Sequence, residues 1–142
     1  MNSIAKLSFF LATLFLSNLS YSQWTDVGGG NSNSTHALLT WDGKLVNLGS
    51  FNNTPCDRVA TWDGTAWTCL GGGVGIVARA GVVWDGKLVV VGDFWNVQQP
   101  CVGCNGVAVW DGVSWQPLVN GVNNDVLTCT VWNNQLVIGG DF

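Results

Sequence analysis

The fold class of this chain follows from one stretch of sequence, Ala80-Gly-Val-Val-Trp84-Asp-Gly-Lys-Leu-Val-Val-Val-Gly-Asp-Phe94. Runs rich in Val lie on both sides of the dipeptide Asp85-Gly86, and β-branched and aromatic residues favour strands. Asp-Gly suits a two-residue type I′ turn, because both central residues of that turn need a positive φ. The stretch therefore predicts a β-hairpin.

The same pattern occurs at two further places, Ala37 to Phe51 and Thr128 to Phe142. In all three copies, the Trp before the turn lies 10 positions before the final Phe. Asn133-Asn134 replaces Asp-Gly in the third copy, and Asn also tolerates a positive φ. We therefore expect three equivalent hairpins.

A second pattern alternates with the first. It reads Val59-Ala-Thr-Trp62-Asp-Gly-Thr-Ala-Trp67-Thr-Cys-Leu70 in one copy and Val107-Ala-Val-Trp110-Asp-Gly-Val-Ser-Trp115-Gln-Pro-Leu118 in the next. The whole unit repeats after 43 positions at its first step and 48 at its second. In the first unit, four strands are predicted at residues 37–41, 44–48, 58–62 and 67–70, with turns at 42–43 and 63–64.

A four-stranded sheet of this composition has two apolar faces, because successive side chains of a strand point to opposite sides. One face carries Leu45, Leu88 and Leu136, and the other carries Val46, Val89 and Val137. Radial stacking of such sheets buries both faces, and a period of 40 to 50 residues is typical of β-propeller blades. A β-sandwich or a β-solenoid is the alternative architecture. We expect the Trp residues of the repeat to pack between the sheets: Trp41, Trp62, Trp67, Trp84, Trp110, Trp115 and Trp132.

The repeat resembles the kelch blade, in which a Gly pair is followed by an aromatic residue and then by a Trp. Gly139-Gly140, Trp110 and Trp115 carry this resemblance. The repeat is more similar still to the Trp-Asp-Gly repeats of secreted bacterial proteins and of the fungal cortical cell-polarity marker propeller. The resemblance implies an all-β, kelch-like β-propeller from Trp24 to Phe142 and says little about function. Departures from the family pattern are Gly49-Ser50 and Gly92-Asp93, where a Gly pair is usual, and Trp in place of the commoner Tyr.

Residues 1–22 are predicted to be a signal peptide. Lys6 precedes an apolar run from Leu7 to Leu19, and Ser20 and Ser22 place small residues before a cleavage site at Gln23. The run spans roughly 20 Å as a helix, against about 30 Å of membrane hydrocarbon. An uncleaved anchor is the alternative. We expect a secreted protein (extracellular, at the cell surface or periplasmic) with no membrane span after signal cleavage.

Residues 23–142 are expected to form a partial propeller of about two and a half blades. Its parts are an orphan strand at 24–27, blades at 36–70 and 77–119, and a half blade at 126–142. Propellers close with roughly four to eight blades. We therefore expect that further C-terminal blades, or self-assembly of a short chain, close the ring.

Composition limits the chemistry available to this chain. The nine acids are all Asp, the formal net charge is −4, and His36 is the only histidine. An acidic balance argues against a nucleic-acid partner. Asp42, Asp63, Asp85 and Asp111 each precede Gly in a turn, which explains them without catalysis. We expect no catalytic residue, no metal site and no cofactor.

Export makes the five cysteines disulfide candidates: Cys56, Cys69, Cys101, Cys104 and Cys129. A local loop disulfide between Cys101 and Cys104 is the favoured interpretation, and free or differently paired thiols are the alternative. Because five is odd, at least one thiol is free or pairs outside the chain.

Trp95 falls outside the repeated Trp positions and begins a lengthened loop that includes Gln98 and Gln99. A loop Trp with two Gln suits stacking on a sugar ring or on a partner's side chain; the alternative is that Trp95 folds over the blade edge. We interpret the chain as an exported non-catalytic scaffold at the cell surface that binds a protein or glycan ligand. The alternative is the front part of a secreted enzyme whose catalytic residues lie beyond residue 142.

Overall fold

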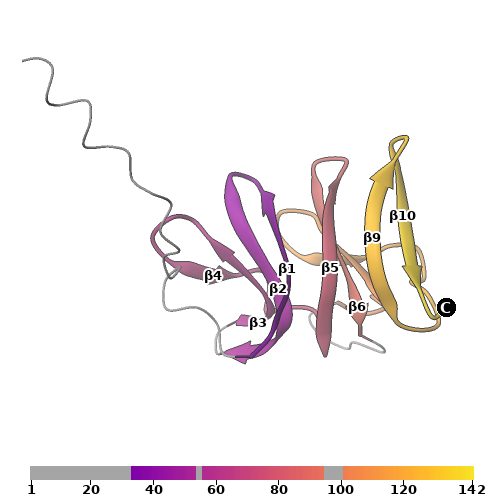
Figure 1. Cartoon of the computed structure of the whole chain (residues 1–142), viewed down its shortest axis with the longest axis horizontal. Coiled ribbons are helices and arrows are strands. Elements are labelled where there is room, and N and C mark those ends of the chain that lie inside the picture. Colours follow the sequence, from indigo (N-terminus) through magenta and orange to yellow (C-terminus); the bar gives the residue numbers. More distant parts are fainter. Residues whose placement is uncertain (1–32, 54–55, 95–100) are drawn as a thin grey trace, which may run out of the picture.

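The computed structural model describes residues 33–53, 56–94 and 101–142, which form ten β-strands and no helix (Figure 1). The first sheet contains, in this order, β1 (Thr35–Trp41), β2 (Lys44–Asn53), β3 (Cys56–Trp62) and β4 (Trp67–Cys69). The second sheet contains β5 (Val77–Trp84), β6 (Lys87–Asp93), β7 (Val107–Trp110) and β8 (Trp115–Pro117). The third sheet contains β9 (Val126–Trp132) and β10 (Gln135–Gly140). All paired strands are antiparallel.

The prediction of an all-β chain is confirmed. Within the described ranges, no helix exists that is long and apolar enough to cross a membrane. The predicted signal peptide at 1–22 and the predicted orphan strand at 24–27 lie outside the described residues.

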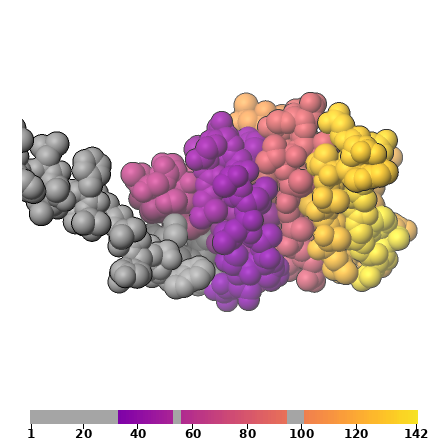
Figure 2. Space-filling model, turned by 45° about the horizontal axis from the view of Figure 1, so that its top comes forward, coloured from indigo at the N-terminus to yellow at the C-terminus, as the bar shows by residue number. Residues whose placement is uncertain are grey.

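The three sheets stand side by side, with their first strands next to one another. β1 contacts β5, and β5 contacts β9. Each of these strands is the edge strand of its sheet. Figure 2 shows the three sheets as adjoining bands without a gap between them on the face that is turned to the viewer. Neighbouring sheets therefore cover each other.

Two apolar clusters fill the spaces between the sheets. Buried residues of the first cluster come from facing sides of the first and second sheets and include Val46, Leu48, Val59, Leu88, Val90 and Ala108. The second cluster joins the other side of the second sheet to the third sheet and includes Val89, Val91, Val107, Val109 and Val126. The predicted division of Leu88 and Val89 between opposite faces is confirmed. Complete burial of a Val or Leu side chain contributes roughly 1.5–3 kcal/mol.

The first turn of each sheet has the predicted backbone geometry. In the first sheet, Asp42 has a φ of 50° and Gly43 a φ of 69°. In the third sheet, Asn133 and Asn134 have φ values of 47° and 61°. Both central residues of each turn have a positive φ, as a type I′ turn requires. Asn-Asn therefore substitutes for Asp-Gly without a change of fold.

The second and third strands are longer than predicted at one end. β2 continues beyond the predicted residue 48 to Asn53, and β3 begins at Cys56 rather than Arg58. The extension follows an irregularity, because Leu48 pairs with Val59 and the next pair is Asn52 with Asp57. Such a bulge interrupts the regular alternation of side chains from which strand ends are predicted.

Six of the seven repeat Trp residues are buried or half-buried, but Trp132 is 64% exposed. The expectation that Trp132 packs between sheets is therefore wrong for the described residues, because no described strand covers the far side of the β9–β10 sheet. Trp110 and Trp115 meet edge to face, with ring centroids 5.2 Å apart, and belong to the first cluster. Trp62 and Trp67 form the equivalent pair in the first sheet, at 5.5 Å.

The connections between sheets pass very close to other backbone. Gly73 has a φ of 93°, and a Cβ at this position would overlap the carbonyl oxygen of Asp57. Gly121 holds the equivalent position 48 residues later, and a Cβ there would overlap the carbonyl oxygen of Asn105. Only glycine satisfies both the backbone angle and the contact.

Replacing Gly73 with Ala is expected to destabilise the chain much more than replacing Gly72. Gly72 has a φ of 84° but open space around its Cβ position. Gly72→Ala should therefore cost only the backbone strain, about 1–2 kcal/mol. Gly73→Ala adds the overlap with Asp57, and a total loss above about 3 kcal/mol is expected from urea unfolding. Equal losses in the two variants would contradict the close contact.

The turn between β3 and β4 is formed by residues 63–66, the four residues left between the predicted strands at 58–62 and 67–70. One carboxylate oxygen of Asp63 accepts hydrogen bonds from Thr65 N at 2.8 Å, Thr65 Oγ1 at 2.7 Å and Ala66 N at 2.9 Å. Asp111 accepts hydrogen bonds from the backbone of Val113 and Ser114 in the same way. The Asp side chain of this second turn type therefore closes a four-residue loop.

These hydrogen bonds, above all the one from the Ala66 N–H, lower the pKa of Asp63 from its ordinary 3.8 to about 2. Because the folded pKa lies below the unfolded one, the stabilisation is fully present above pH 3.8 and is lost as the pH falls toward 2. An NMR titration of the Asp carboxyl carbons should find Asp63 titrating near 2. Thr65→Ala, which removes the hydroxyl donor, should raise that pKa. A pKa near 3.8 in the unaltered chain would refute the capping role.

Candidate functional site

The connections between strands gather at two ends of each sheet, which differ in character. The turn end carries the short turns at 42–43, 63–66, 85–86, 111–114 and 133–134. The loop end carries the longer connections from β4 to β5, from β6 to β7 and from β8 to β9. Because binding residues concentrate on loops held by a rigid scaffold, the loop end is the candidate functional surface.

The predicted binding residues Trp95, Gln98 and Gln99 belong to the β6–β7 connection but lie outside the described residues. Both ends of this connection are described. Phe94 is fully buried where β6 ends. The connection is therefore anchored in the core on its β6 side.

On the β7 side, Cys101 and Cys104 form a disulfide with their Cα atoms 5.5 Å apart. This is the pairing that the sequence favours. Both cysteines are buried and belong to the first apolar cluster, whereas Val102 between them is 64% exposed. The buried side chains of the two cysteines therefore pack this part of the loop against the core.

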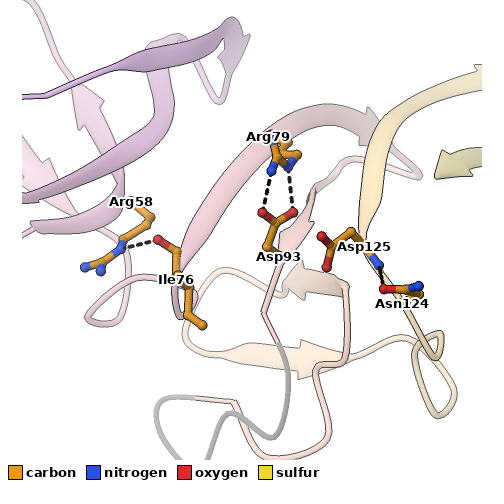
Figure 3. Close-up of polar contacts among 6 residues, drawn as sticks. All are labelled: Arg58, Ile76, Arg79, Asp93, Asn124 and Asp125. Atoms are coloured by element: carbon orange, nitrogen blue, oxygen red, sulfur yellow. Dashed lines mark hydrogen bonds and ion pairs between the residues drawn. The ribbon is translucent and has the colours of Figure 1, made fainter. Parts of the chain in front are cut away.

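A second ordered feature of the loop end is the ion pair between Arg79 and Asp93 (Figure 3). Arg79 Nε donates to Asp93 Oδ1 at 2.6 Å, and Arg79 Nη2 donates to Asp93 Oδ2 at 2.5 Å. An irregularity in the pairing of β5 with β6 lies between Ala78 and Ala80, at the position of Arg79. The two parallel hydrogen bonds fix the end of β6, from which the β6–β7 connection departs.

The surroundings of Arg79 are acidic. The hydrogen-bonded carboxylate of Asp93 raises the pKa of Arg79 above its ordinary value, and the charges of Asp125 and Asp141 act in the same direction. Asp125 begins the approach to β9 and stands beside the pair in Figure 3. The guanidinium therefore links the second sheet electrostatically to both ends of the third-sheet hairpin.

Arg58 makes the corresponding link between the first and second sheets. Its Nε donates to the carbonyl oxygen of Ile76 at 2.8 Å, immediately before β5 (Figure 3). Its Nη1 lies 3.3 Å from a carboxylate oxygen of Asp57. Ile76 itself is 59% exposed and presents an apolar side chain at the loop end.

The roles of Arg79, Asp93 and Arg58 were not predicted from the sequence. A signal was present, because Arg79 takes the repeat position of His36 and Leu127, and Asp93 takes that of Ser50. Only the second unit therefore combines a base and an acid at these two positions. His36 is exposed on β1. In the described ranges, no group of three or more His, Cys, Asp or Glu side chains is arranged to hold a metal ion.

Of the remaining three cysteines, two form a disulfide and one is a free thiol. Cys56 and Cys69 form a second disulfide, which joins β3 to β4 with Cα atoms 4.9 Å apart. Cys129 on β9 is a free thiol, in agreement with the odd number of cysteines. Burial raises the pKa of Cys129 to about 11, so this thiol stays protonated and unreactive at neutral pH.

In comparisons with family models, curated proteins and solved structures, nothing matched this chain. The resemblance to kelch repeats therefore stays a prediction from the sequence.

A double-mutant cycle of Arg79→Met and Asp93→Asn should show a coupling of about 1 kcal/mol at low ionic strength, with less in about 1 M NaCl. The estimate is modest because the two side chains are 37% and 18% exposed. Urea unfolding of the four proteins measures the coupling. Arg58→Met combined with Asp93→Asn is the control, with no expected coupling. A coupling that is absent, or that salt leaves unchanged, would contradict the ion pair.

Proposed function

We propose that this chain is an exported segment of a β-propeller and a non-catalytic scaffold that binds a protein or glycan ligand through its loop end. The main support for a propeller architecture is a hydrogen bond that recurs between successive sheets. Trp41 Nε1 donates to the carbonyl oxygen of Gly86 at 3.1 Å, and Trp84 Nε1 donates to that of Asn134 at 3.1 Å. Donor and acceptor hold the same repeat positions in both cases.

A contact that recurs at the same repeat positions implies that each sheet is related to the next in a similar way. The first strands β1, β5 and β9 lie side by side, and contacts between neighbouring sheets concentrate on them. In a propeller, equivalent sheets repeat around a central axis and each contacts the next. This supports the propeller over a sandwich, in which two sheets pack face to face only once.

The binding role is supported by the way in which the β6–β7 connection is held. The Arg79–Asp93 pair fixes the strand before it, and the buried Cys101–Cys104 disulfide fixes its return. A loop with both ends fixed loses less conformational entropy when it binds a ligand. Trp95 on this loop offers an aromatic face for a sugar ring or a side chain, and Gln98 and Gln99 offer amide hydrogen bonds.

The acids of the turn end support a non-catalytic role for this chain. Asp63 and Asp111 are engaged by backbone N–H groups of their own turns, which lower their pKa values and leave them ionised. A general acid needs the opposite shift. The two disulfides agree with export to an oxidising compartment, because such bonds are rare in the cytosol.

Binding is tested with the full chain, exported through residues 1–22 and collected from the medium or periplasm. It is applied to a glycan array and used in pull-downs of cell-surface proteins. Trp95→Ala is expected to lower the affinity for the captured ligand roughly tenfold, the loss of one stacking contact. Trp132→Ala, which removes an exposed Trp at the turn end, is the matched control and should bind normally. The absence of a ligand in both screens, or full binding by Trp95→Ala, would overturn the proposal.

A further inference from the structure

A groove of about 570 Å³ lies between the second and third sheets. Trp84, Leu118 and Val119 line one side of it, and β10 lines the other. A second hollow of about 290 Å³ adjoins it, shares Trp84 and Leu118, and extends over Val109 and Gln116. The groove therefore runs over the part of the second sheet that the β9–β10 hairpin leaves uncovered.

The equivalent groove, between the first and second sheets, is filled by side chains. Trp41, Leu70 and Gly71 hold there the repeat positions of Trp84, Leu118 and Val119. Trp115 Nε1 donates to the carbonyl oxygen of Leu70 at 2.8 Å, and Trp41 and Leu70 pack against the cluster that contains Trp110 and Trp115. The occupant of the first groove is thus the β7–β8 hairpin of the next sheet.

That hairpin is also hydrogen-bonded to the strand before it. Leu88 of β6 pairs with Trp110 of β7, and Val91 pairs with Val107. In the third sheet, β10 is the counterpart of β6, and among the described strands it pairs only with β9 (Figure 1). Within the part of the chain that the structure describes, β10 therefore offers an unpaired edge directly beside the groove, the arrangement that accepts an added strand.

We propose that the groove and the free edge of β10 form a docking site for a β-hairpin of the chain's own class, Val-x-x-aromatic-Asp-Gly-x-x-Trp-x-x-Leu. The docked hairpin supplies the third and fourth strands of the β9–β10 sheet. Its Trp indole N–H donates to the carbonyl oxygen of Leu118, as Trp115 does to Leu70. This inference rests on the proposed function in one respect, the stacking of the sheets as successive blades. It does not depend on which ligand binds at the loop end.

Val119 limits the size of the ring that fits at the first aromatic position of the docked hairpin. In the filled groove, a Cβ on Gly71 would lie 2.6 Å from Cζ3 of Trp110 and 3.0 Å from Cη2, the far edge of its indole. Val119 has that Cβ, a φ of 56° and an exposed fraction of 84%. The groove of the third sheet therefore prefers a hairpin with a ring shorter than indole at the first aromatic position.

The probe is a synthetic peptide of residues 107–118, closed into a hairpin by a disulfide between cysteines added at its ends and labelled with fluorescein. Fluorescence anisotropy measures its binding to the full exported chain. The Trp110→Phe peptide should bind the unaltered chain more tightly than the native-sequence peptide does. Val119→Gly should strengthen binding of the native-sequence peptide roughly tenfold, because it removes the overlap. The Trp115→Ala peptide should lose binding in both chains.

Val119→Trp should abolish binding by filling the groove, and since Val119 is exposed this change leaves the core intact. Val113→Gly and Val113→Trp are matched controls at an exposed Val of the turn end and should change nothing. The inference is overturned if neither peptide binds the unaltered or Val119→Gly chain, if Trp115→Ala binds equally well, or if the Val113 variants act like the Val119 variants. A failure here with retained Trp95-dependent ligand binding leaves the proposed function standing.

Discussion

The indole N–H groups of Trp41 and Trp84 each donate a hydrogen bond to a carbonyl oxygen in the first turn of the following sheet. These hydrogen bonds accompany the packing of each sheet against the next, which covers the apolar faces of the sheets. A small antiparallel sheet with two apolar faces is stabilised when neighbouring sheets cover those faces. Three features allow this stacking. The repeat spacing places equivalent strands in each sheet, Leu88 and Val89 belong to two different clusters, and glycines allow backbone to approach backbone.

Much of the fold could be predicted from the sequence because its signals are local. Asp-Gly and Asn-Asn fix the backbone of the first turns, and alternating Val and Leu fix which face of a strand is buried. The end of β2 could not be predicted, because the bulge after Leu48 depends on pairing with β3 rather than on residue type. The length of the turn at 63–66 follows from the predicted strands, but the hydrogen bonds that close it were not predicted, because the dipeptide Asp63-Gly64 does not show that the Asp63 carboxylate accepts from Thr65 and Ala66.

Less of the candidate site could be predicted. The sequence favoured the Cys101–Cys104 pairing, since two cysteines three positions apart meet readily in a loop, but it left the partners of the other cysteines open. Cys56 and Cys69 meet only because β3 and β4 form a hairpin. The pairing of Arg79 with Asp93 likewise depends on where the register of β5 and β6 shifts. Contacts of this kind come from the three-dimensional register of strands, which a single sequence specifies only indirectly.

Hydrogen exchange of the tryptophan indole N–H groups, followed by NMR in the intact chain, tests the stacking of sheets most directly. Slow exchange is expected for Trp41 and Trp84, whose indole N–H groups donate to the next sheet, and for Trp115, whose indole N–H donates to Leu70. Trp132 is 64% exposed and should exchange rapidly. Exchange of Trp41 and Trp84 as fast as that of Trp132 would contradict the repeated contact between sheets and the architecture built on it.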